Sequence, residues 1–265
     1  KTVVGPGTTT DYFPLFLSVG ILMLASVAIL FFTIKENKLR AGMVHEDEPE
    51  EETGAVQNTS ELPKDVKRSL FFILISVSLW FISYNAVTTA FSRYATHVWG
   101  LENGGYADCL MVCTVAAIIS YLPIGIISSK IGRKKTIMIG LVLLASCFFF
   151  AGMLNSFHWV MNILFAVVGF AWASIGVNSF PMVVEMSAAG DVGKYTGLYY
   201  TFSMSAQVIT PILSGVLLEH ISYRTLFPYS VFFAILALIT MSQVKHGDSK
   251  PIQKKSMLES FDVDD

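Results

Sequence analysis

The sequence predicts an all-α integral membrane protein with seven transmembrane helices. Of its 265 residues, 53% are hydrophobic and 14% are charged, which fits neither an ordinary globular domain nor a disordered chain. Seven windows of about twenty residues are almost free of charge, the length that a helix needs to cross a hydrocarbon core of about 30 Å. A membrane β-barrel is excluded, because its short strands alternate apolar and polar residues and these windows do not.

The windows follow one another along the chain, and charge is almost absent from them. Of the 18 basic and 20 acidic residues, only Asp108 falls inside a window. The first window is too long for the apolar core of a cleavable signal peptide, and basic residues follow it instead of preceding it. The seven predicted transmembrane helices are Phe13–Ile34, Leu70–Phe91, Ala107–Ser128, Thr136–Leu154, Trp159–Val184, Tyr195–Leu218 and Leu226–Val244.

One long connection divides the chain. Residues 35–69 contain an acidic run from Glu46 to Glu52 and few large apolar residues, so this segment cannot bury enough surface to fold alone. We expect it to be a flexible cytoplasmic linker. The six later windows are joined by short connections and should form one compact bundle over residues 70–244, followed by a polar cytoplasmic tail over residues 245–265.

The distribution of basic residues predicts the orientation in the membrane. Cytoplasmic loops retain Lys and Arg, and one set of alternate loops holds 15 of the 18 basic residues. The opposite set holds only Lys1, Arg93 and Arg224. We therefore expect the amino terminus of this chain outside, the carboxyl terminus in the cytoplasm, and a multi-pass protein of the plasma membrane. Because the chain starts at Lys1 without a Met, we also expect it to be a piece of a longer protein.

The connection between the third and fourth windows is a glycine-containing basic turn. It reads Gly125-Ile-Ile-Ser-Ser-Lys130-Ile-Gly132-Arg133-Lys134-Lys135. Gly132 can adopt the positive φ that a tight reversal requires, and the basic side chains suit helix carboxyl ends and anionic lipid. A simple positive-inside turn would explain that much.

The order of residues in this turn resembles the G-x-x-x-D-[RK]-x-G-R-[KR] signature of the major facilitator superfamily. Ser129 stands where the signature has an acidic residue, so the helix-capping carboxylate of the motif is absent from the turn. The resemblance implies that the seven windows are helices six to twelve of such a transporter. Residues 1–34 would then hold the last helix of an amino-terminal bundle that is otherwise missing, and residues 70–244 the complete six-helix carboxyl-terminal bundle.

A narrower resemblance covers the fifth and sixth windows. The segments run from Asn178 through Pro181 to Glu185, from Asp191 to Ser203, and from Gln207 to Pro211. They are similar to the sucrose:proton symporters and the related glycoside, pentoside and hexuronide symporters. This resemblance implies a sugar carrier coupled to a cation, most simply a proton, whose two bundles rock around a midplane site.

Candidate solute-binding residues follow from the need for polar side chains at membrane depth. In the second window, Tyr84 and Thr88 lie four apart on one helix face, and Asn85 and Thr89 form the adjacent row. This stripe has more polar groups than helix packing requires. In the sixth window, Tyr200 and Gln207 suggest a weaker version of the pattern, for which packing is an equal alternative. In the fifth window, Trp172 could stack on a sugar ring or serve packing, and Asn178 could donate hydrogen bonds.

The basic turn supplies the candidate gating residues. Glu185 ends the fifth window on the same side of the membrane as Arg133, and a carboxylate there is costly unless it is paired. We therefore expect an ion pair between them. The complete gating or structural set is Gly125, Lys130, Gly132, Arg133, Lys134 and Glu185. The carboxylates Asp108, Glu185 and Glu219 all lie near window ends, so we expect the coupling residue in the missing bundle.

Other functional classes have little support in the sequence. Cys109 and Cys113 are four apart on one helix face, but two ligands are too few for a metal site, and we expect no metal and no cofactor. No nucleotide-binding glycine loop, nucleophile with an adjacent base, or nucleic-acid-binding motif is present, so we expect neither an enzyme nor a nucleic-acid partner. A seven-helix receptor remains the alternative, because seven spans with an external amino terminus are its topology.

Overall fold

A computed structural model describes residues 13–33, 63–101, 104–186 and 192–248. These residues form helices and no strand. They fall into two units, the first within residues 1–59 and the second within residues 60–265, and each is described by itself. The all-helical membrane fold predicted from the sequence is confirmed.

The described part of the first unit is one helix, α1, which spans Phe13–Thr33. It has 21 residues and no charged side chain, so at 1.5 Å per residue it is about 30 Å long. Ser26 donates its hydroxyl hydrogen to the carbonyl oxygen of Leu22 at 2.9 Å, which satisfies this polar group within the helix. The first predicted window is therefore a helix of membrane-spanning length.

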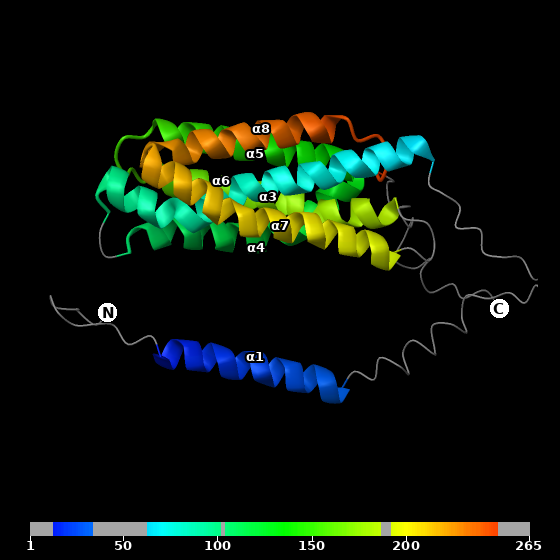
Figure 1. Ribbon diagram of the computed structural model, residues 1–265, viewed down its shortest axis with the longest axis horizontal. Coiled ribbons are helices and arrows are strands. Elements are labelled where there is room, and N and C mark those ends of the chain that lie inside the picture. The colour runs from blue at the N-terminus through cyan, green and yellow to red at the C-terminus, as the bar shows by residue number, and fades with distance from the viewer. Residues whose placement is uncertain (1–12, 34–62, 102–103, 187–191, 249–265) are drawn as a thin grey trace, which may run out of the picture. The chain divides into compact units, whose positions relative to one another are not determined.

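The second unit is a bundle of six long antiparallel helices (Figure 1). All six are long and apolar enough to cross a membrane, the last together with a short 3₁₀ turn that precedes it. The elements are α3 (Lys64–Trp99), α4 (Tyr106–Ile131), α5 (Arg133–Met153), α6 (Val160–Glu185), α7 (Val192–His220), η1 (Tyr223–Thr225) and α8 (Leu226–Ser242).

Several helices are longer than the charge-free windows. Helix α3 starts at Lys64, so residues 64–69, which we expected in the linker, are helical. It also continues to Trp99, beyond the predicted end of the span. A charge-free window marks the stretch that lies in hydrocarbon, whereas the helix itself continues into the headgroup region, where polar side chains meet water. The remainder of the predicted linker lies outside the described residues.

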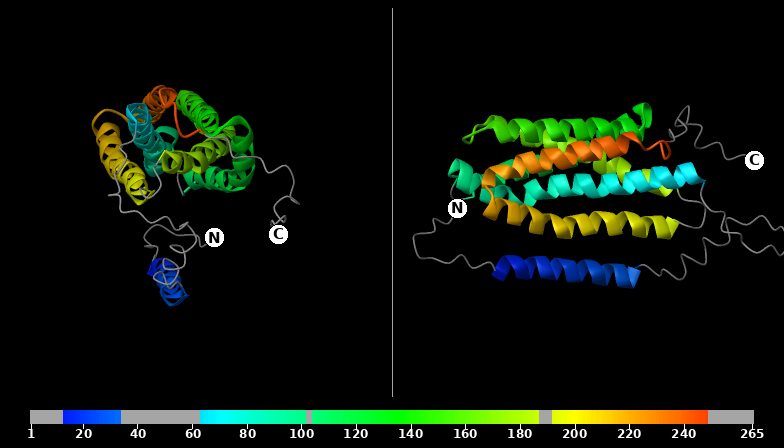
Figure 2. Two further views of the ribbon diagram at one scale, coloured as in Figure 1. Left: turned by 90° about the vertical axis from the view of Figure 1, so that its right-hand side faces the viewer. Right: turned by 45° about the horizontal axis from the view of Figure 1, so that its top comes forward.

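The six helices form an open ring in the order α4, α6, α5, α8, α3, α7. Helix α4 packs mainly on α6 and α7 mainly on α3, while α4 and α7 hardly touch each other (Figure 2). Helices α3 and α6 face each other across the ring with few backbone approaches. We call the side of the ring on which α4 and α7 do not pair the gap side; on this side α6 and α7, and α3 and α4, approach each other in places.

Close packing on the rest of the ring depends on small residues. A Cβ atom on Gly169 would lie 2.1 Å from the carbonyl oxygen of Cys113 in α4. On Gly140 it would lie 2.8 Å from the carbonyl oxygen of Ala171 in α6. Small residues let membrane helices approach closely where the hydrophobic effect gives no drive for association. Gly169 and Gly140 thus have a packing role in the bundle.

Buried hydroxyl groups add hydrogen bonds between helices. The hydroxyls of Ser76 and Thr240 lie 2.7 Å apart, and Ser83 donates to the carbonyl oxygen of Ser230 at 2.7 Å, which ties α3 to α8. Such bonds contribute about 0.6 kcal/mol each on average in membrane proteins. These bonds use the face of α3 that packs against α8.

We name the two ends of the bundle by their content. The basic end holds residues 129–135, together with the first residues of α3, α5 and α7 and the last residues of α4, α6 and α8. The opposite end holds the other six helix termini. These names are independent of which end faces the cytoplasm.

Candidate functional site

The central feature of the gap side is an aromatic cluster formed by Phe81, Tyr84 and Trp172. The rings of Tyr84 and Trp172 stack with their centroids 3.9 Å apart and an interplanar angle of 9°. Phe81 meets the same indole edge-on at 5.2 Å. The cluster fills the space between α3 and α6, where the helix backbones stay apart, and all three side chains remain partly exposed.

A third helix joins the aromatic cluster through a sulfur contact. The hydroxyl oxygen of Tyr84 lies 3.9 Å from the Sγ atom of Cys113 in α4, at the limit of a hydrogen bond to sulfur. Tyr84 thus contacts α4 and α6 from its place on α3. Helices α4 and α6 lie on one side of the aromatic cluster and α3 lies on the other. The cluster therefore joins side chains from both sides.

The predicted polar stripe of α3 flanks the aromatic cluster. Asn85 and Thr88 are half-buried and Thr89 is exposed. Each side chain donates one hydrogen bond within the helix: Asn85 Nδ2 donates to the carbonyl oxygen of Phe81 at 2.8 Å, and Thr89 Oγ1 to that of Asn85 at 2.6 Å. Thr88 donates in the same way to the carbonyl oxygen of Tyr84. These bonds leave the second N–H and the Oδ1 of Asn85, and the lone pairs of the threonine oxygens, for a bound solute.

The predicted residues of α6 and α7 do not all meet the α3 stripe. Asn178 is buried, and its Nδ2 donates to the carbonyl oxygen of Ser174 at 2.8 Å. Gln207 is half-buried and bonds weakly to its own helix at 3.4 Å. Tyr200 is 48% exposed and packs beside Phe180. Asn178 is thus placed as a packing residue, whereas Tyr200 and Gln207 lie on accessible parts of α7.

Sequence reasoning missed Phe81 and Cys113. Phe81 lies three positions before Tyr84, so the helical period could have placed both rings on one face of α3. Cys113 gave no such signal, because its part in the cluster depends on how α4 packs against α3. An apolar residue in a transmembrane window has no sequence feature that separates a ligand-facing position from a lipid-facing one.

The basic end contains the predicted ion pair. The guanidinium of Arg133, at the start of α5, donates to a carboxylate oxygen of Glu185, at the end of α6. The two side chains are 24% and 26% exposed, so water only partly screens their attraction. Gly132 has a φ of +100°, which explains why glycine occupies the turn between α4 and α5.

The other predicted residues of the turn differ in their environment. The ammonium of Lys134 donates to the carbonyl oxygens of Ser242, the last residue of α8, at 2.9 Å and of Val244, two residues beyond it, at 2.5 Å. Lys130 is exposed. Gly125 lies within α4, and a Cβ atom there would meet nothing within 4 Å, so close packing does not require glycine at this position.

The opposite end has a second, more exposed ion pair. Arg93 on α3 lies 2.9 Å from Glu219 on α7, with side chains that are 56% and 54% exposed. Nearby, the guanidinium of Arg224 donates to the side-chain oxygen of Asn155 at 2.7 Å. Polar groups therefore link the helices at both ends of the bundle, but with different access to water.

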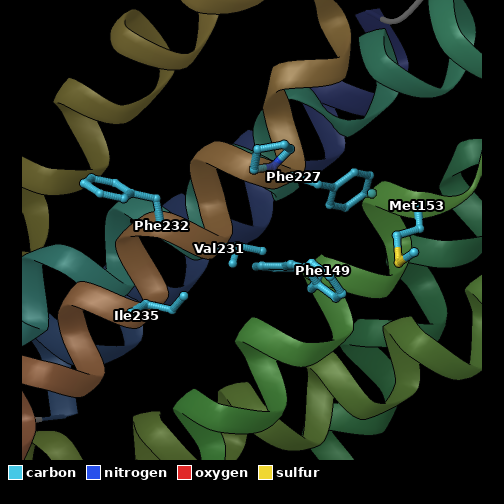
Figure 3. A pocket seen from close by; sticks show the side chains of 9 residues that line it. Phe149, Met153, Phe227, Val231, Phe232 and Ile235 are labelled. Atoms are coloured by element: carbon cyan, nitrogen blue, oxygen red, sulfur yellow. The ribbon is translucent and has the colours of Figure 1, made fainter.

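A pocket of about 430 Å³ lies between α5 and α8 (Figure 3). Its lining is aromatic and aliphatic, with Phe149, Met153, Phe232 and Ile235 around it. A polar solute would find no hydrogen-bonding side chain among these residues. The pocket therefore offers apolar surface alone, whereas the aromatic cluster offers ring surface together with hydrogen-bonding groups on its polar flank, so we take the cluster as the candidate solute site.

Comparison with known proteins gives a family-level match. The family model for the Major Facilitator Superfamily matches residues 106–259. The chain is 24% identical over 244 residues to multidrug resistance protein 2 of Bacillus subtilis, covering 89% of this chain and 58% of that protein. It is 22% identical over 139 residues to the chloramphenicol resistance protein CraA of Acinetobacter baumannii, covering 52% of this chain and 33% of that protein.

The fold has a solved counterpart. The crystal structure of the human organic anion transporter MFSD10 (TETRAN) superposes with a TM-score of 0.54 at 11% identity, over 71% of this chain and 49% of that chain. The chain thus spans roughly half of the structure and between a third and three fifths of the two bacterial relatives. Such low identity supports the fold alone.

Proposed function

The chain belongs to the Major Facilitator Superfamily, and on this premise we propose that it is the substrate-binding half of a secondary active transporter for an amphipathic organic solute. Members of this superfamily are multi-pass membrane transporters, which fits six helices of spanning length in the described residues. The observation that carries the proposal is the partly exposed Tyr84–Trp172 stack on the gap side of the ring, flanked by the amide of Asn85.

The chemistry of this site favours a ligand that is flat or apolar on one side. The aromatic cluster offers ring surface, which binds through dispersion and through offset or edge contacts. The polar flank offers one amide and two threonine hydroxyls; the hydroxyl hydrogens and one of the two amide hydrogens are already used within α3. A solute with few hydroxyl groups needs few hydrogen-bond partners, so it loses little binding energy when these side chains stay bonded within α3. The names of the bacterial relatives, which refer to multidrug and chloramphenicol resistance, support the same class of solute.

Sugar transport by cation symport is the second candidate. It is supported by the sequence resemblance across residues 178–211, and by Trp172, whose indole could stack on the apolar face of a sugar ring. A sugar needs several hydrogen-bonding partners to replace its water shell. On α3 the oxygens of Asn85, Thr88 and Thr89 can accept, but the intrahelical bonds leave only one amide hydrogen to donate, which is few partners for a sugar, so the sugar hypothesis ranks second.

The transport mechanism we propose is alternating access. A second bundle, in the rest of a longer protein, would cover the gap side of the ring, and rocking of the two bundles would open the solute site to each side in turn. The basic end would face the cytoplasm of a plasma membrane, as the distribution of Lys and Arg favours. One proton driven by 100 mV supplies about 2.3 kcal/mol. The carboxylate that binds this coupling proton would lie on the second bundle.

Transport by the complete protein in proteoliposomes tests this proposal. We expect labelled chloramphenicol to move in response to an imposed proton gradient and to stop moving when a protonophore is added. Trp172→Ala should raise KM about threefold to tenfold, because the stacking surface is lost. Trp172→Phe should retain most of the affinity.

Trp159→Ala is the matched control, because Trp159 is 63% exposed at the opposite end of the bundle and lies outside the aromatic cluster. Movement of labelled sucrose or maltose without any movement of chloramphenicol would replace the first proposal with the second. An unchanged KM for Trp172→Ala would show that the aromatic cluster is not the solute site.

A further inference from the structure

The segment after α8 folds back across the basic end of the bundle. Residues Lys245–Asp248, here called the strap, belong to the stretch that we expected to be a polar tail without fixed structure. Instead, the carboxylate of Asp248 accepts a hydrogen bond at 3.0 Å from the backbone N–H of Lys134, in the first turn of α5. The strap thus ends on the basic turn.

Helix α5 needs such an acceptor. The first amides of a helix have no partner within it, and a side-chain carboxylate near them satisfies a donor and favourably opposes the helix dipole. The residue at the N-cap of α5 is Gly132, which has no side chain to accept such a bond. Asp248 therefore supplies the group that the turn itself lacks.

Glycine at position 132 leaves room for the Asp248 carboxylate. A Cβ atom on Gly132 would lie 3.0 Å from Oδ1 and 3.1 Å from Oδ2 of Asp248. Any larger residue would have to push the carboxylate away from α5. Gly132 thus serves both the positive φ of the turn and the approach of the strap.

Contacts with three helices hold the strap in place. The backbone N–H of Lys245 donates to the hydroxyl of Ser69 on α3 at 3.2 Å, and the same hydroxyl lies 2.9 Å from Nδ1 of His246. Gly247 has a φ of +81°, and a Cβ atom on it would lie 2.6 Å from the carbonyl oxygen of Met182 on α6. The strap therefore touches α3, α5 and α6 within four residues.

We propose that Asp248 is a positioning residue of the transport cycle, in place of the acidic residue that the family signature has at the position of Ser129. Asp248 caps the start of α5 beside the Arg133–Glu185 ion pair, and the strap contacts with α3 and α6 hold its carboxylate in place. This inference rests on the proposed transport function. Tyr84 lies fifteen residues along α3 from Ser69, about 22 Å at 1.5 Å per residue, so Asp248 should affect turnover and leave solute affinity unchanged.

The test uses the complete protein in proteoliposomes with the substrate it is found to carry. We expect Asp248→Ala to lower Vmax about fivefold, the size of a lost helix cap, with KM unchanged. Adding Ser129→Asp to Asp248→Ala should restore most of the Vmax, because a carboxylate then returns to the turn from α4. Asp262→Ala, which removes the same charge from the tail outside the described residues, should transport like the parent protein.

Two readouts report the docking of the strap itself. Trypsin should cut after Lys245 faster in Asp248→Ala than in the parent protein, and the amide hydrogen of Lys134 should exchange faster. Ser129→Asp should restore neither the protection of Lys245 nor the docked strap, although it restores transport. Restored transport without a docked strap would show that the carboxylate acts as a cap on α5 and not by stabilising the whole fold.

The inference is overturned if Asp248→Ala transports at the parental rate, if its KM changes as much as its Vmax, or if Ser129→Asp fails to restore turnover. A parent protein that moves none of the tested solutes would instead contradict the proposed function. The trypsin and exchange measurements would then still decide whether Asp248 docks the strap, because they do not require a substrate.

Discussion

The two ends of the bundle are held together by different physical means. At the basic end, the Arg133–Glu185 pair and the strap place polar bonds between helices, in a region where the paired side chains are about a quarter exposed. At the opposite end, the Arg93–Glu219 pair is more than half exposed, and aromatic packing lies beneath it. Partly desolvated ion pairs interact more strongly than exposed ones, so we expect polar bonds to matter most at the basic end.

The comparison bears on the transport function proposed above, in which the two ends open in turn. A polar connection can be exchanged for water when an end opens, whereas an aromatic core loses its packing when it is separated. The polar contacts of the basic end can thus form and break reversibly. The opposite end of this bundle has the chemistry of a fixed joint, formed by Phe91, Tyr94, Trp99 and Phe227.

The largest effect is expected from breaking the aromatic joint. Phe227 is fully buried and meets Tyr94, Phe91 and Phe148 with centroid distances of 4.9, 6.5 and 6.1 Å. Phe227→Ala should destabilise the bundle by about 3 kcal/mol, through lost contacts and the cavity that remains. Thermal unfolding in detergent measures the effect, with the exposed Phe150→Ala as control. Equal losses in the two variants would contradict a joint at this end.

A smaller effect is expected from the turn at the basic end. Gly132→Ala should cost about 1–2 kcal/mol, because a residue with a Cβ is strained at a φ of +100° and crowds Asp248. Gly125→Ala is the matched control, since it lies in a helix with open space around it and should be neutral or slightly stabilising. The same unfolding assay reports both variants. If Gly125→Ala were the more destabilising of the two, the account of the turn would be wrong.

The smallest effects separate the two ion pairs. A double-mutant cycle on Arg133 and Glu185 should give a coupling energy of about 1 kcal/mol, against about 0.3 kcal/mol or less for Arg93 and Glu219. Added salt should weaken the exposed pair more. Charge reversal at both Arg133 and Glu185 should recover part of what either reversal alone removes. Equal coupling energies at the two ends would remove the electrostatic part of the comparison.

Parts of the site were within reach of sequence reasoning and parts were not. The Arg133–Glu185 pair was expected from two charges near window ends on one side of the membrane, and it is present in the structure. The α3 stripe was found from its helical period, but the period could not show that Asn85, Thr88 and Thr89 donate to their own helix. Sequence periodicity places a side chain on a face and leaves its hydrogen-bond partner open.

The chain sequence by itself determined the membrane spans and the location of the basic turn. Both are local properties, since the cost of placing charge in hydrocarbon is decided residue by residue and a reversal needs its glycine at one position. The tertiary structure decided which residues complete the two sites. Asp248 reaches Lys134 across 114 positions of sequence, and Tyr84 meets Trp172 across the ring, because helix packing alone brings such distant segments together.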